Sequence, residues 1–214
     1  MSFFRNVSIA LVAAFAFTGA PATTASGPSV KLPDYQTVTL DNGATVLLMP
    51  RRDVPLVAAS VAVRGGALAD APGKEGTADL LGEMLSKGAG DRNALEFAQA
   101  VDGAGGSLGF GSSREAITAS AQFLSKDSAL MLSLLADALL RPNMDASEFD
   151  KLRKRAIDGI ANAKDSDPRQ LIGLYSGGWL FRGHPYGRST GGDETSLATI
   201  NRADLQAFRQ QQMG

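Results

Sequence analysis

The alternation of apolar and polar residues predicts three strands before the first helix. Thr37–Leu40 and Thr45–Met49 are β-branched and apolar runs around Asp41-Asn42-Gly43, which is typical of a hairpin with a tight turn. Leu56–Val63 predicts a longer strand that ends at Gly65-Gly66. A second pair of strands is predicted at Ser107–Ser113 and Glu115–Leu124, the latter with one apolar face made of Ile117, Ala119, Ala121 and Phe123.

Helical periodicity recurs between and after these strands. The predicted helices are Thr77–Lys87, Asn93–Gly103, Asp127–Leu140, Asp145–Lys164, a helix from Asp167-Pro168 with Leu171, Leu174 and Trp179 among its apolar residues, and Asn201–Gln212. Thr77 is the predicted N-cap of the first helix. Asn93 with Glu96, and Asp145 with Glu148, have the spacing of capping boxes.

The order of these elements is β-β-β-α-α-β-β-α-α-α-α. Strands come in adjacent groups and do not alternate strictly with helices. This order predicts an α+β domain with a largely antiparallel sheet and helices packed on one face.

Composition narrows the chemistry that this chain can perform. A formal net charge of −1 over 214 residues gives no electrostatic reason to expect binding to nucleic acid or anionic lipid. The chain has no cysteine, which excludes disulfides, thiolate metal sites and a cysteine nucleophile. His184 is the single histidine, so a site that needs two imidazoles cannot form within this chain. His184 itself, beside Pro185 and Tyr186, is interpreted as a packed or hydrogen-bonded loop residue.

The N-terminal residues have the pattern of a secretory signal peptide. Arg5 precedes the apolar run Val7–Thr18, and Ala20-Pro21-Ala22 fits a cleavage site. The run is shorter than the roughly 20 apolar residues of a membrane span. We therefore expect a cleaved signal peptide at 1–22, a tether at 23–36, and a periplasmic or secreted protein without a membrane span after cleavage. The alternative is an uncleaved anchor.

The helix at 77–87 carries two acids at metal-ligand spacing. Asp79 and Glu83 are four residues apart and share one face of the helix, so both could coordinate one cation. Two carboxylates alone make a weak site for a hard cation. Gly82, between them, has no side chain and cannot act as a general base. From these residues alone the helix is predicted to carry two solvated acids.

The stretch Gly76–Gly88 nevertheless resembles the signature helix of the insulinase/pitrilysin zinc peptidases, Gly-x-Ala-His-x-x-Glu-His-Met-x-x-Lys-Gly. The resemblance implies that Asp79 and Glu83 stand where the family has its two zinc-binding histidines. It also implies that Gly82 stands where the family has its catalytic Glu.

The resemblance continues along the chain from about Thr37 to Gln212. In a register without gaps, Gly159 falls on the third zinc ligand of the family, a Glu, and Leu152 falls on the Glu of its Phe-x-x-Glu-Arg segment. A register shifted by one residue would put Ile160 at the ligand position. Further matching segments are Leu40–Val46, Val63–Gly66, Gly105–Glu115, His184–Gly187 and Ile200–Leu205.

The family also pairs an edge strand with an extended substrate peptide. This implies a peptide contact at Gly109, Phe110 and Gly111 through the backbone, which needs no zinc. The alternative is an ordinary edge strand weakened by its glycines.

Together these matches imply a single insulinase/pitrilysin-like N-terminal domain at 37–214, truncated before its last strand and before a second domain. We predict a non-catalytic subunit of an exported metallopeptidase without activity or a cofactor of its own. It would form a heterodimer with a zinc-bearing subunit and help that partner enclose or position peptides. The alternatives are a structural or assembly subunit, and a hydrolase with an altered metal site.

Overall fold

The computed structural model describes residues 33–166 and 168–213, and the chain divides at Arg52 into two compact units. In the first unit, β1 (Gln36–Thr39) and β2 (Thr45–Leu48) form the predicted antiparallel hairpin, with Val38 opposite Val46. The predicted signal peptide and most of the predicted tether lie outside the described residues. The single domain predicted at 37–214 stays a prediction.

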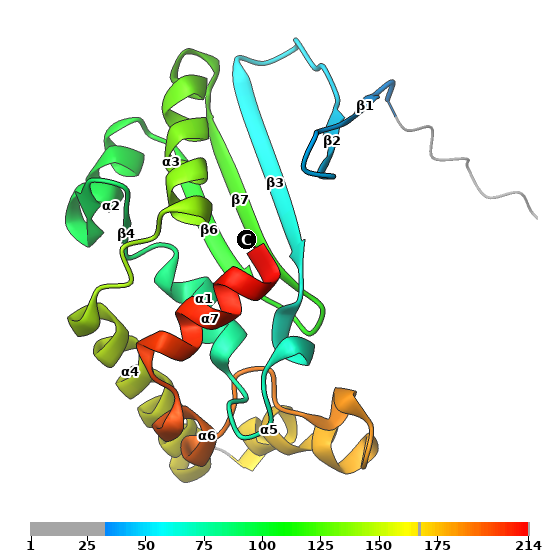
Figure 1. Ribbon diagram of the computed structural model, residues 1–214, viewed down its shortest axis with the longest axis vertical. Helices are drawn as coiled ribbons and strands as arrows, with labels where there is room; N and C mark the ends of the chain where they lie inside the picture. The colour runs from blue at the N-terminus through cyan, green and yellow to red at the C-terminus, as the bar shows by residue number, and fades with distance from the viewer. Residues whose placement is uncertain (1–32, 167, 214) are drawn as a thin grey trace, which may run out of the picture. The chain divides into compact units, whose positions relative to one another are not determined.

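The second unit is built on the antiparallel sheet β3-β7-β6 (Figure 1). Its strands are β3 (Leu56–Arg64), β6 (Ser107–Ser112) and β7 (Ala116–Leu124). Ala121 of the central strand β7 lies opposite Ala59 of β3, and Ala119 lies opposite Phe110 of β6. These strands confirm the three longer strands expected from the sequence.

One face of this sheet is buried and the other is open in the second unit. The buried β7 residues are those of its predicted apolar face, Ile117, Ala119, Ala121 and Phe123. Their neighbours Thr118, Ser120 and Gln122 are exposed. Helices α1 (Thr77–Met84) and α3 (Ser128–Leu140) contact the sheet from the buried side, which confirms an α+β fold with helices on one face.

The remaining helices are α2 (Ala94–Gly103), α4 (Ala146–Ser166), α5 (Pro168–Leu180), α6 (Glu194–Thr199) and α7 (Arg202–Met213). They pack around this assembly: α4 and α7 contact α1, α5 and α6 contact α4, and α2 contacts β6 (Figure 1). None of the helices in the described ranges is both long and apolar enough to cross a membrane. The longest, α4, is rich in charged residues along its whole length.

Several short elements were not predicted, among them two strands and one α-helix. The first predicted helix ends at Met84, and the chain then forms β4 (Gly88–Ala89) and β5 (Arg92–Asn93), which pair with each other. Gly88, the first residue of β4, has a φ of 100°, a conformation that favours glycine. The third is α6, which is only six residues long and is capped by Asp193.

The capping predictions have mixed outcomes. Asn93 and Glu96 form the predicted reciprocal capping box. The Asp145 carboxylate accepts hydrogen bonds from the N–H groups of Ser147 and Glu148, as expected of an N-cap. The prediction that Thr77 caps α1 is wrong, because Thr77 is the first residue of the helix and Gly76 is its N-cap.

Asp70 supplies the missing cap from a preceding loop. Its buried carboxyl accepts hydrogen bonds from the N–H groups of Gly76, at 2.8 Å, and Ala78, at 2.9 Å. Burial raises the pKa of Asp70 from 3.8 to about 6, although these two hydrogen bonds act in the opposite direction. The start of α1 is therefore stabilised by one buried acid that lies six residues before its N-cap, Gly76.

We expect Asp70→Ala to destabilise the protein by about 1–2 kcal/mol, because the substitution leaves helix N–H groups without a partner. The folded pKa lies above the ordinary value of 3.8. The contribution of Asp70 is therefore fully present below that value and is lost as pH rises through about 6. Urea unfolding should show a larger loss for Asp70→Ala at about pH 4 than at about pH 7.5.

Asp145→Ala is the matched control, since it removes an exposed cap whose pKa is lowered by hydrogen bonds, first from Glu148. Its contribution is present above the ordinary pKa and is lost as pH falls, so its pH dependence has the opposite sign. Equal pH dependence of the two variants would contradict the assignment of a raised pKa to Asp70.

Candidate functional site

The three positions of the altered motif lie on α1, which packs between the sheet, α4 and α7. Asp79 and Glu83 are both half-buried, and Gly82 is buried. The pKa of Asp79 is raised, first by burial and then by the negative charge of Glu83 one turn away. The helix thus brings the two acids together as predicted, and they repel each other.

Glu83 is not a free carboxylate, because Arg155 of α4 donates a hydrogen bond to it and forms an ion pair. Arg155 was not singled out by the sequence analysis, and no local pattern links two residues 72 positions apart. Glu83 stands at the position of the second zinc ligand, and the contact places the guanidinium of Arg155 beside it.

The other positions that the resemblance assigned to the zinc site lie on the same helix as Arg155, α4. Gly159 lies one helical turn after Arg155, on the same face, and no atom outside its own stretch of helix lies within 4 Å of the place where a β-carbon would be. Ile160, the alternative ligand position, packs against the apolar core. Leu152 is 3% exposed and belongs to the core cluster that includes Leu81 and Met84. The position of an acid in the family is therefore occupied here by a core residue.

Gly82 packs against the edge strand. A β-carbon at position 82 would lie 3.1 Å from the carbonyl carbon of Gly111 in β6, which is closer than an ordinary contact. Helix α1 and β6 therefore approach each other closely at this point, and the absent side chain makes room for strand backbone.

These residues do not fit a zinc ion. Gly82 and Gly159 offer no donor atom, and the carboxylate of Glu83 is already paired with the positive charge of Arg155. In the described ranges, no three His, Cys, Asp or Glu side chains form a group that could hold a metal. Asp79 alone does not supply the four-coordinate shell that zinc prefers.

The predicted peptide-contact residues lie on the edge strand β6. Gly109 and Phe110 pair with Ser120 and Ala119 of β7, and no other strand in the described part of this unit pairs with β6. Phe110 turns toward the core, where it packs against both apolar clusters. Gly109 is exposed, and Gly111 lies on the same open side of the strand.

His184 lies in the predicted kind of environment. Its Nδ1 atom accepts a hydrogen bond of 3.2 Å from the N–H of Tyr186, and the two rings are in edge contact. Tyr186 in turn donates from its hydroxyl to the Glu115 carboxylate. Arg114 donates to the carbonyl oxygen of Tyr186 at 2.7 Å. Arg114 and Glu115, in the turn between β6 and β7, therefore anchor the loop around His184.

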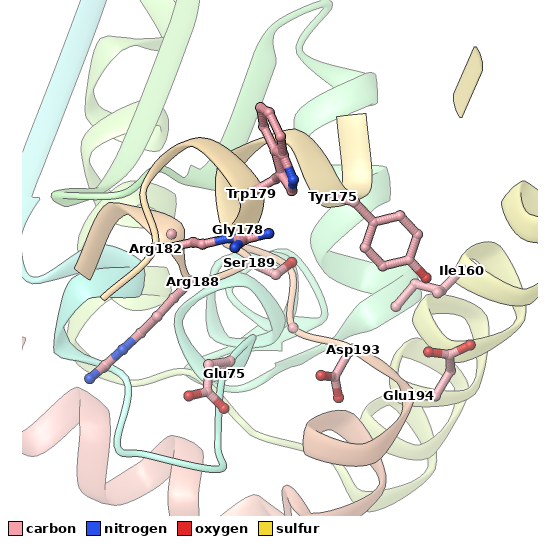
Figure 2. Close-up of a pocket in the computed structure, with 12 residues that line it drawn as sticks. Glu75, Ile160, Tyr175, Gly178, Trp179, Arg182, Arg188, Ser189, Asp193 and Glu194 are labelled. Carbon is pink, nitrogen blue, oxygen red and sulfur yellow. The ribbon is translucent and has the colours of Figure 1, made fainter. Parts of the chain in front are cut away.

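A cavity of about 590 Å³ lies beside α5 and was not expected from the sequence (Figure 2). Tyr175 and Trp179 lie on one side of it, and the carboxylates of Glu75, Asp193 and Glu194 lie on the other side. Its lining comes from four separate segments of the chain, at 75, 160, 175–182 and 187–194. The local signal in the sequence was the spacing of Tyr175 and Trp179, four positions apart. The sequence analysis placed Trp179 among the apolar residues of the helix.

Glycine-to-alanine substitutions should distinguish the two glycines of the site. Gly159→Ala fills open space in a helix, so we expect a gain in stability of about 1 kcal/mol. Gly82→Ala meets the backbone of Gly111, so we expect no gain or a net loss despite the same helix propensity. Urea unfolding monitored by circular dichroism measures both. An equal gain for the two variants would show that α1 and β6 are not in close contact at Gly82.

Comparison with known proteins agrees with this description. Residues 45–194 match the family described as Insulinase (Peptidase family M16). A protein of Mycobacterium tuberculosis named as an uncharacterized zinc protease is 32% identical over 133 residues, which are 62% of this chain and 30% of that protein. The mitochondrial-processing peptidase subunit beta of Lentinula edodes is 26% identical over 80% of this chain and 37% of its own length. This chain thus spans less than half the length of these relatives.

Two solved structures share the fold. A crystal structure described as the peptidase M16 inactive domain from Pseudomonas fluorescens has a TM-score of 0.78 and 27% identity, and the match covers 82% of this chain and 43% of that one. A protease from Helicobacter pylori has a TM-score of 0.76 at 22% identity, over 84% of this chain and 43% of that one. The family match covers more than half of the sequence, and the chain therefore belongs to the insulinase family of peptidases, M16.

Proposed function

We propose that this chain is a non-catalytic subunit of an exported insulinase-like metallopeptidase, and that it holds an extended peptide for a zinc-bearing partner. One observation carries the proposal: the edge strand β6 lies directly against α1, whose site positions supply neither a general base nor a set of metal ligands. The part of the fold that can bind a peptide is kept, while the part that would cleave it is altered.

The altered site cannot perform the family's chemistry with its own residues. Hydrolysis of a peptide bond needs a group that takes a proton from water and a charge that stabilises the oxyanion. At position 82 there is no side chain, and the carboxylate of Glu83 is neutralised by Arg155. Asp79 is half-buried. Its pKa is raised, first by burial and then by the negative charge of Glu83 one turn away.

Strand addition at β6 is supported by its pairing and surroundings. One edge of β6 pairs with β7 and its other edge has no strand partner in the described part of the unit. An unpaired edge presents N–H and C=O groups that an extended peptide can pair with. The glycines at 109 and 111 place no side chain on the open face of the strand, so a second backbone can approach closely.

A role beside an active partner is supported by the relatives. The peptidase of Lentinula edodes is named as a subunit, and the Pseudomonas fluorescens structure is named as an inactive domain. The predicted signal peptide supports export to the periplasm or medium. Zinc would then be bound by the partner and not by this chain.

Peptide binding at β6 should be visible by hydrogen exchange. Unstructured peptides of about ten residues, a length that extends well past one strand, should slow amide exchange in residues 107–112 and leave α3 unchanged as an internal control. N-methylation of alternate peptide residues should abolish the protection in one register and preserve it in the other, because only one set of N–H groups faces β6. Equal protection of residues 107–112 by peptides N-methylated in either register would argue against strand addition.

The subunit role is tested by purification and metal analysis. We expect the tagged full chain to copurify with an M16 protein that has an intact His-x-x-Glu-His helix. It should raise that protein's kcat/KM for peptides while showing no cleavage alone. A stable complex without proteolytic activity would favour the structural or assembly role instead. Stoichiometric zinc in the isolated chain, with cleavage abolished by Asp79→Ala, would instead identify a hydrolase with an altered metal site.

A further inference from the structure

A second hollow, of about 350 Å³, lies on a different side of α5 from the cavity that Trp179 lines. Its helical side includes Ser176 and Gly177. The segment 187–192 and Arg114, in the turn after β6, also line it. The chemistry of this hollow is set by these residues and differs from that of the aromatic cavity.

The described residues that line the hollow carry two positive charges and no negative one. Arg114 and Arg188 are its only charged residues, and both are half-buried. Arg114 donates to the carbonyl oxygens of Tyr186 and Arg188, and Arg188 donates to the carbonyl oxygen of Asp70. Neither arginine forms an ion pair with an acid in the described part of the chain. The carbonyl oxygens fix the two guanidinium groups but do not neutralise them, so an anion in the hollow would supply the missing charge.

Three hydroxyl groups of the lining are also without partners. Ser176, Ser189 and Thr190 are half-buried, and none of their hydroxyls makes a hydrogen bond with a described residue. Polar side chains that leave the solvent are normally hydrogen-bonded. A hydroxyl group can donate its proton to the oxygen of an anion. These side chains therefore add unused donors to the two arginines.

The backbone of the same turn has unused donors as well. The N–H groups of the consecutive residues 189–191 donate to no backbone carbonyl oxygen in the described ranges. The next residue, Gly192, is buried and has a φ of 76°, in the left-handed region. Successive N–H groups in turns of this kind can form a concave site for an anion.

Tight packing fixes the turn before any ligand binds. A β-carbon at Gly76 would lie 2.8 Å from the carbonyl oxygen of Gly191, and a β-carbon at Gly192 would lie 2.2 Å from that of Glu75. The turn therefore lies directly against the backbone that begins α1. A site that is formed in advance loses little conformational entropy when it binds a ligand.

One negative charge lies behind the turn. A β-carbon at Gly191 would lie 3.6 Å from a carboxylate oxygen of Asp79. Asp79 does not line the hollow, but its charge is close enough to weaken the binding of an anion there. Asp79 and the two arginines should therefore have opposite effects on anion affinity.

We infer that this hollow binds a compact oxyanion, which is held by Arg114, Arg188 and the donors of the turn at 189–191. Carboxylate and phosphate groups share the required chemistry, because their oxygens accept charge-assisted hydrogen bonds from guanidinium groups. The site does not depend on the peptide binding proposed at β6.

Inorganic phosphate is the first probe, titrated into the full chain by calorimetry at constant ionic strength. We expect one saturable site. Arg188→Gln should weaken binding about tenfold, because it removes a charge-assisted partner. Arg182→Gln is the matched control, since it removes the same charge just after α5 from a residue that does not line this hollow. Equal weakening by the two variants would show that phosphate responds only to general positive charge, and would overturn the inference.

Two further variants leave the arginines and their carbonyl contacts intact. The double variant Ser189→Ala/Thr190→Val removes two hydroxyl donors and should weaken phosphate binding about fivefold. Asp79→Asn removes the charge behind the turn and should tighten binding about two- to threefold. If the arginines only hold the loop in place, neither variant changes phosphate affinity, and that result would contradict the site.

N-acetylglycine and N-acetylglycinamide identify the source of the anion, because they differ only in a carboxylate and an amide. Saturable binding of phosphate alone supports a phosphate site. Binding of N-acetylglycine, but not of the amide, supports a site for a carboxylate such as the C-terminus of a peptide. Binding of neither anion, or equal binding of the amide, overturns the inference. The strand pairing proposed at β6 is judged separately, by hydrogen exchange in residues 107–112.

Discussion

The burial of α1 is the constraint on which the second unit of this structure depends. Ala78, Leu81, Met84 and Leu85 are all 0% exposed, and the helix contacts the sheet, α4 and α7. Burying a large apolar side chain contributes about 1.5–3 kcal/mol relative to leaving it in water. Substitutions at these positions would disconnect the sheet from the helices that cover it. The apolar part of the helix is therefore held by packing, whatever chemistry its other residues perform.

The three altered motif positions of the same helix differ in how strongly packing constrains them. Asp79 and Glu83 are half-buried on the side that faces α4, and other contacts have replaced metal chemistry there. An ion pair with Arg155 now links α1 to α4, and Gly82 lets the backbone of β6 approach. A helix can thus keep the apolar residues that pack it into the fold while the residues at other positions of the family motif differ.

The edge strand and the altered motif positions are neighbours in the structure. β6 has no second strand partner in the described part of the unit, and it lies against α1 at Gly82. Arg114, in the turn after β6, donates to the carbonyl oxygens of Tyr186 and Arg188 and so holds the loop around His184. Backbone pairing needs no metal and no general base, which is why the proposed role beside a catalytic partner does not depend on the altered positions.

Local patterns in the sequence determined much of the fold. The hairpin, the three longer strands, the buried face of β7 and the Asn93–Glu96 capping box were all predicted, because sequence patterns that span a few residues indicate each of them. The position of Asp79, Gly82 and Glu83 on one helix was predicted for the same reason. Composition alone, with a single histidine and no cysteine, excluded the usual metal site within this chain.

Tertiary structure decided the contacts between distant segments. The cap of α1 by Asp70, the pairing of Glu83 with Arg155, the approach of Gly82 to Gly111 and the cavity at α5 could not be predicted from the sequence. Each depends on where whole elements pack, and no periodicity records which exposed charge or glycine will meet another. Sequence pattern determined most of the elements and which residues stand at the family's motif positions, whereas packing determined what those residues contact.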